Sequence, residues 1–80
     1  MLNDEGTKLQ KFEDGYPLDR ALIVVNREDI YFVGFYDWEK HYIKEFGRDN
    51  KIANTDCYWQ YVLHPRGGIL FVNNKNKLTL

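Results

Sequence analysis

Aromatic side chains crowd one stretch of this chain and limit how it can fold. Ten of its thirteen aromatic residues lie between Tyr31 and Tyr61, although the whole chain has only 80 residues. A chain this short has a small core, because it buries only about 60% of the surface that it exposes when unfolded. So many large rings are more than such a core holds comfortably. Some of them are therefore expected to face a partner molecule.

Length and cysteine content favour one domain in a reducing compartment. Domains usually have roughly 100–200 residues, so residues 1–80 are expected to form a single domain, with residues 1–7 as a flexible terminus. Cys57 is the only cysteine, which excludes a disulfide within the chain and is typical of cytoplasmic proteins. No apolar run approaches the roughly 20 residues that cross a bilayer. The sequence predicts a cytoplasmic protein that does not enter a membrane.

The net charge is small and unevenly distributed. It totals −1, with seven acidic and four basic residues in 1–29 and five acidic and seven basic residues in 30–80. Dedicated nucleic-acid-binding proteins are usually far more basic. This balance therefore favours an ordinary solvated surface.

The apolar pattern predicts a mainly antiparallel sheet of five or six strands. Residues 21–26 and 30–36 are apolar, β-branched and aromatic, and the polar break between them predicts a hairpin. Four further strands are expected at residues 8–12, 57–63, 69–72 and 77–80. Turns rich in glycine, proline and asparagine separate these segments.

Residues 37–46 fit two different structures. Large rings recur there every four residues, at Trp38, Tyr42 and Phe46, a spacing that suits one side of a helix or one side of a strand. Ile43 lies beside Tyr42 and Phe46 only at helical spacing, and Asp37 can cap a first helical turn. We therefore expect a helix packed on one face of the sheet, and the predicted fold class is α+β.

Most of the core is expected to come from the strands. The apolar positions expected to be buried are Leu22, Ile23, Val24, Val25, Phe32, Phe35, Trp59, Tyr61, Leu63, Leu70 and Phe71, together with Tyr42 and Phe46. Cys57 shares the apolar face of its strand and is expected to be a small core residue with an inert thiol. Tyr58 and Gln60 point to the other face, which is expected to be half-exposed.

No pattern of reactive residues predicts an enzyme, a metal site or a cofactor. Cys57 and His64 are seven residues apart in one predicted strand, so they project to opposite faces and cannot share an ion unless a bulge intervenes. The chain contains no serine that could serve as a nucleophile. Arg66, Gly67 and Gly68 could hold an anion at a turn, but a hairpin that needs glycine explains the same residues.

Protein binding is the favoured function. Tryptophan, tyrosine and arginine dominate interface hot spots because they bury a large area. The residues expected to be exposed for a partner are Tyr36, Trp38, Tyr58, His64 and Arg66. The sequence predicts a small non-enzymatic adaptor or inhibitor of another protein, of the kind common among phage and mobile-element proteins.

Two alternatives remain open. A single-stranded nucleic acid could stack on Tyr58 beside Gln60 and Arg66, with a flank of basic residues at Lys40, Lys44, Arg48 and Lys51. Acidic residues are interleaved with that flank, which weakens the case. Alternatively, the chain could be a self-associating structural protein that forms a homodimer through an edge strand.

Overall fold

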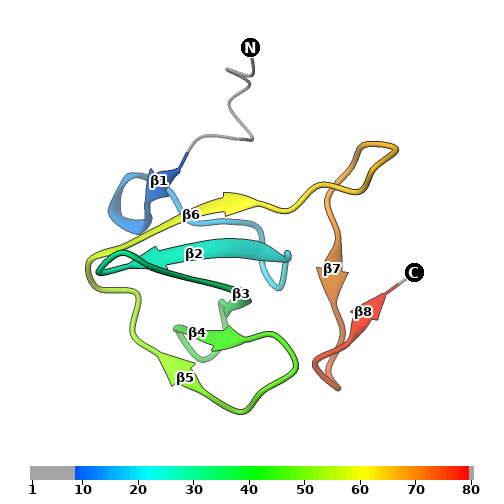
Figure 1. Cartoon of the computed structure of the whole chain (residues 1–80). Coiled ribbons are helices and arrows are strands. Elements are labelled where there is room, and N and C mark those ends of the chain that lie inside the picture. The colour runs from blue at the N-terminus through cyan, green and yellow to red at the C-terminus, as the bar shows by residue number, and fades with distance from the viewer. Residues whose placement is uncertain (1–8, 80) are drawn as a thin grey trace.

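The computed structural model describes residues 9–79, and the predicted flexible terminus at 1–7 lies outside them. The elements are β1 (Gln10–Lys11), η2 (Phe12–Asp14), β2 (Ile23–Arg27), β3 (Ile30–Asp37), β4 (Tyr42–Glu45), β5 (Lys51–Ile52), β6 (Cys57–Tyr61), β7 (Phe71–Val72) and β8 (Leu78–Thr79). Six strands form one antiparallel sheet in the order β1-β6-β2-β3-β4-β5, and β7 pairs with β8 in a second sheet. In Figure 1 the β7–β8 pair stands beside the large sheet.

The predicted α+β class is wrong. Within residues 9–79 the only helical element is η2, a single turn of 3-10 helix three residues long, and no helix there is long and apolar enough to cross a membrane. The described fold is antiparallel sheet, and no helix packs on a face of it.

The helix predicted over residues 37–46 is instead the end of β3, a tight turn and β4. Asp37 does not cap a helix: its Oδ1 accepts hydrogen bonds from the backbone N–H groups of Glu39 and Lys40 in a turn. His41 then takes a positive φ of 60° and reverses the chain. Ile43 is fully buried opposite Tyr36 in the register, so strand pairing and burial in a distant core outweighed the helical spacing.

The predicted hairpin of the first two long segments is confirmed. Arg27 pairs with Ile30 at its end, which leaves a two-residue turn of Glu28 and Asp29. Both turn residues have positive φ, at 53° and 65°, as a type I′ turn requires. Because this turn matches the right-handed twist of its flanking strands, β2 and β3 form a long, regular ladder in the middle of the sheet.

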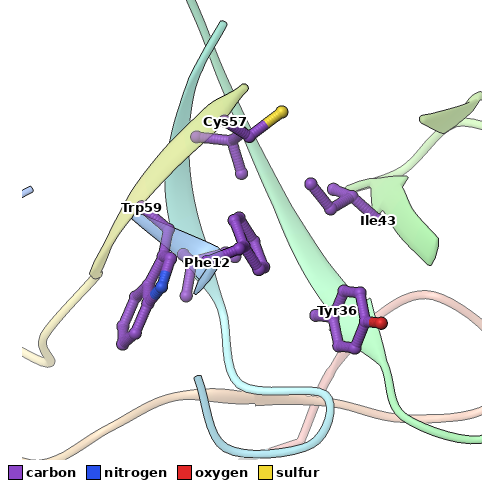
Figure 2. Packing of buried hydrophobic residues seen from close by; sticks show 7 residues of the cluster. Phe12, Tyr36, Ile43, Cys57 and Trp59 are labelled. Atoms are coloured by element: carbon purple, nitrogen blue, oxygen red, sulfur yellow. The ribbon is translucent and has the colours of Figure 1, made fainter. Parts of the chain in front are cut away.

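One face of the large sheet carries the main core. Figure 2 shows Phe12 projecting from η2 into a group of side chains from β3, β4 and β6. The buried members of this cluster are Phe12, Ile23, Val25, Tyr36, Ile43, Cys57 and Trp59. Trp59 donates its indole N–H to the Gly15 carbonyl at 2.9 Å, which ties the loop after η2 to β6.

The opposite face is covered over only part of its area, by β7 and β8. Leu22, Phe35 and Val72 form a second buried cluster there. Arg20 joins the two sheets: its Nε donates to the Val72 carbonyl at 2.9 Å, and its guanidinium lies 4.7 Å from the centre of the Phe35 ring. The backbone adds to this link, because the Val72 N–H donates to the Arg20 carbonyl.

The predicted core is correct only in part: of its thirteen positions five are buried and two are exposed, and six are half-buried, namely Val24, Phe32, Tyr42, Phe46, Tyr61 and Leu70. Leu22, Ile23, Val25, Phe35 and Trp59 are buried as expected. Leu63 and Phe71 are 44% and 40% exposed. Leu63 follows the end of β6 at Tyr61, and on β7 the alternate residue Val72 faces the core in place of Phe71. The buried positions of Phe12, Ile43 and Val72 were not predicted.

Candidate functional site

A cleft lined by aromatic rings opens beside the main core. It is formed by Tyr16, Tyr36, Trp38 and His41 and has a volume of about 320 Å³; we call these four residues the aromatic cleft. Tyr16 is 50% exposed and Trp38 is 49% exposed. Leu18, in the same loop as Tyr16, is 47% exposed. The loop before β2 and the turn after β3 therefore place a set of apolar side chains in contact with solvent.

Hydrogen bonds hold Trp38 in place although half of it is exposed. Its indole Nε1 donates to the Pro17 carbonyl at 2.9 Å, and its backbone N–H donates to Asp19 Oδ1 at 2.9 Å. Both acceptors belong to the loop that also carries Tyr16. Because its ring is already anchored, Trp38 has little rotamer entropy left to lose when a partner covers it.

The floor of the aromatic cleft is part of the core. Tyr36, expected among the exposed residues, is only 3% exposed, and its ring centre lies 5.0 Å from that of Tyr16 and 5.5 Å from that of Phe12. Burial raises the pKa of the Tyr36 phenol above its ordinary value, and the nearby Tyr16 and Asp37 raise it further. The Tyr36 phenol therefore stays uncharged at physiological pH.

Tyr58 lies on the other side of β6 from the core residues Cys57 and Trp59. It is 37% exposed, as the half-exposed face predicted for this strand requires. Tyr58 does line a second hollow of about 420 Å³, together with Lys11, Tyr16 and Cys57 among others. Of the five predicted binding residues it is the one on the uncovered face of the sheet.

Cys57 in this second hollow is poorly suited to nucleophilic chemistry. Its side chain is 2% exposed, and its thiol lies 3.5 Å from the carbonyl oxygens of Ala53 and Thr55. Burial raises the pKa of the Cys57 thiol above its ordinary value, which lowers the fraction of reactive thiolate. Among residues 9–79, no three histidine, cysteine or acidic side chains are grouped closely enough to hold a metal ion.

His64 and Arg66 lie in the turn between β6 and β7 and are not part of the aromatic cleft. His64 Nδ1 accepts a hydrogen bond from the Arg66 backbone N–H at 3.0 Å. Gly67 and Gly68 both have positive φ, at 93° and 92°. The local turn geometry thus accounts for the two glycines.

The structure brings together two of the five predicted binding residues, Tyr36 and Trp38. Sequence reasoning missed Tyr16, although a large ring next to Pro17 is itself an indication of a surface role. It also missed Tyr31, which is 63% exposed on β3.

No protein-family model, curated protein or solved structure matches this chain with significant similarity.

Proposed function

We propose that this protein is a small non-enzymatic protein-binding module, an adaptor or inhibitor whose partner occupies the aromatic cleft. The observation that carries the proposal is the anchored, half-exposed Trp38 beside Tyr16 over a pocket of about 320 Å³. Anchored tryptophan and tyrosine rings around a hollow are typical of interface hot spots. The hollow has room for one large side chain of a partner.

The charges around the aromatic cleft indicate the character of that partner. The segments that line it, residues 16–19 and 36–41, carry two exposed acidic residues and one exposed basic residue: Asp19, Glu39 and Lys40. Complementary charge speeds association and suppresses wrong partners. The partner is therefore a protein segment that inserts an apolar side chain and carries lysine or arginine next to it.

Strand pairing with a second copy has less support. The edge strands β1 and β5 of the large sheet, and β7 and β8 of the small one, are each two residues long. Short edges leave few backbone groups free to pair and are a common protection against edge-to-edge association.

The proposed function is tested by capture of partners from source-cell lysate with tagged wild-type protein, Trp38→Ala and the control Phe71→Ala. The lysate is treated with nuclease so that nucleic acid cannot bridge the proteins. Phe71 is 40% exposed on β7 and outside the aromatic cleft, so its removal controls for the loss of an exposed ring. A hot-spot truncation costs about 2 kcal/mol or more, which corresponds to roughly a 30-fold loss of affinity.

The expected result is one stoichiometric protein that Phe71→Ala retains and Trp38→Ala loses. Arg66→Glu separates this proposal from a site at the β6–β7 turn, because Arg66 does not line the aromatic cleft. A partner lost with Arg66→Glu but kept by Trp38→Ala would contradict the cleft as the binding site. Thermal unfolding of each variant shows whether the substitution has merely unfolded the protein.

A further inference from the structure

The face of the large sheet that β7 and β8 leave uncovered carries exposed rings. Tyr31 is 63% exposed and Tyr58 is 37% exposed. Val33, which lies on β3 between Tyr31 and the covered Phe35, is 39% exposed. Strand alternation puts all three on the face opposite the main core, because their neighbours Phe32, Cys57 and Trp59 pack in that core. We call the surface that carries Tyr31, Tyr58, Asn26, Lys11, Lys44 and Lys51 the tyrosine face.

The register sets the two rings at a spacing suited to stacking. Asn26 on β2 pairs with Tyr58 on β6 and with Tyr31 on β3, so the two tyrosines are two strands apart. Neighbouring strands lie about 4.8 Å apart, which places the two Cα atoms about 10 Å from each other. Rings at this separation can take two bases of an extended single strand, because bases stack on aromatic side chains whatever their sequence.

Lys11 borders one of these rings, and Lys44 and Lys51 lie farther along the same face, level with Phe35 and not with Tyr31. Lys11 pairs with Tyr58 in the register, and its Nζ lies 5.9 Å from the centre of that ring. At the other edge of the sheet Lys44 pairs with Lys51, whose Nζ lies 5.7 Å from the centre of the Tyr42 ring. By strand alternation these three lysines share the face of Tyr31 and Tyr58.

The strands contribute few acidic side chains to this face. By strand alternation only Asp37 among the carboxylates of the six strands points to this side, and it is 9% exposed and paired with Arg20 at 3.6 Å. Glu28 and Asp29 lie in the β2–β3 turn, and Asp56 precedes β6. These three carboxylates are exposed at the ends of the strands, and Asp49 is a fourth at the rim, where it contacts Lys44 Nζ at 3.1 Å.

An unpaired amide lies between the two rings. Asn26 Nδ2 is buried and has no hydrogen-bond partner within the described residues. Buried donors are nearly always paired in native structures. Neighbouring atoms cover this donor, so base binding at this face rests on the two rings and the lysines and not on the amide.

We propose that the tyrosine face binds single-stranded nucleic acid, with bases stacked on Tyr31 and Tyr58 and phosphates beside Lys11 and Lys51. This site is separate from the aromatic cleft and does not depend on the proposed protein partner. It also differs from the platform expected from sequence, because Tyr31 joins Tyr58 and the turn residue Arg66 takes no part. A duplex is expected to bind more weakly, since its bases are stacked on each other and cannot reach the rings.

The test is fluorescence anisotropy with short labelled oligothymidylate and oligouridylate, and with a labelled duplex as the control ligand. Tyr31→Ala and Tyr58→Ala are each expected to weaken binding of the single strands about fivefold or more, from the stacking contribution of one base. Phe71→Ala removes an exposed ring outside this face and is expected to leave the affinity unchanged. Thermal unfolding confirms that each variant remains folded.

Two charge variants test the pairing of lysines with phosphates. Lys11→Gln with Lys51→Gln is expected to lower the slope of log affinity against log salt by about 0.7 for each phosphate that is no longer neutralised. Asp49→Asn removes the carboxylate that competes for Lys44 and is expected to tighten binding. The oligothymidylate and oligouridylate arms distinguish DNA from RNA as the preferred strand.

Equal affinity for the duplex and the single strands would overturn the proposal, and so would single-strand binding that both tyrosine substitutions leave intact. A failure of nucleic-acid binding at the tyrosine face can be distinguished from a failure of protein binding at the aromatic cleft. Tyr31→Ala is outside the aromatic cleft, so partner capture that depends on Trp38 would persist whatever this experiment shows.

Discussion

Gly34 shows how little space the centre of the sheet leaves at one residue. A Cβ added there would lie 2.4 Å from the carbonyl oxygen of Lys44 on the neighbouring strand. Backbone on β4 cannot move aside without breaking pairs of the β3–β4 ladder. Gly34→Ala is expected to cost roughly 1–3 kcal/mol of unfolding free energy, as overpacking usually does, measured by urea denaturation.

Gly15→Ala is the matched control for that measurement. An added Cβ meets nothing within 4 Å at Gly15, and its φ of 165° is extended backbone that any residue adopts. An unchanged urea midpoint for Gly15→Ala is expected. If both variants had the same midpoint as wild type, the close approach at Gly34 would be contradicted.

Tyr36 and Trp38 show why single residues were hard to assign to the candidate site. They are two positions apart, and both have large rings that suit either a core or an interface. Tyr36 is 3% exposed and Trp38 is 49% exposed, because Asp37 ends β3 between them and the turn that follows lies at the surface. The amino-acid composition of this segment therefore does not predict which of the two rings is buried.

At the scale of elements, Asp37 is the residue that organises the β3–β4 connection. Its Oδ1 accepts from two backbone N–H groups and its Oδ2 pairs with Arg20. Asp37→Ala removes all three interactions and is expected to cost about 1–2 kcal/mol of unfolding free energy, by analogy with the loss of a cap. Amide exchange at Lys40 and urea denaturation measure the destabilisation.

Asp37→Asn provides the comparison, because its side-chain oxygen can still accept from the turn. Its destabilisation should be the smaller of the two. If Asp37→Asn were as unstable as Asp37→Ala, the ion pair with Arg20 and not the turn would be the main contribution of Asp37.

For the whole molecule, the connection between the two sheets depends on Arg20. Arg20 donates to the carbonyl oxygens of Val72 and Asn73 on the β7–β8 side. Lysine keeps the charge but lacks the planar set of donors, so Arg20→Lys is expected to cost about 1.5–3 kcal/mol, the usual contribution of hydrogen bonds to a charged group. Faster amide exchange at Val72 relative to β2 and β3 would locate the destabilisation in the small sheet.

Arg66→Lys is the control for Arg20→Lys, since Arg66 is exposed in a turn. It should leave both the unfolding free energy and the exchange at Val72 unchanged. Unaltered exchange at Val72 in Arg20→Lys would contradict the role of Arg20 in joining the sheets.

The sequence by itself determined the features that depend on neighbouring residues. The β2–β3 hairpin, the buried Ile23 and Val25, and the two-sided character of β6 follow from side-chain alternation and from a short polar turn, which are local properties. Tyr58 and Trp59 were therefore placed on the correct faces without any tertiary information.

Tertiary structure alone decided the conformation of residues 37–46 and the location of both candidate surfaces. A spacing of four fits helix and strand equally, and Ile43 became a strand residue because β3 and a distant core made that pairing favourable. The aromatic cleft joins Tyr16 to Trp38, and the tyrosine face joins Tyr31 to Tyr58. Such contacts between residues far apart in the chain depend on how strands pair, which local sequence patterns do not encode.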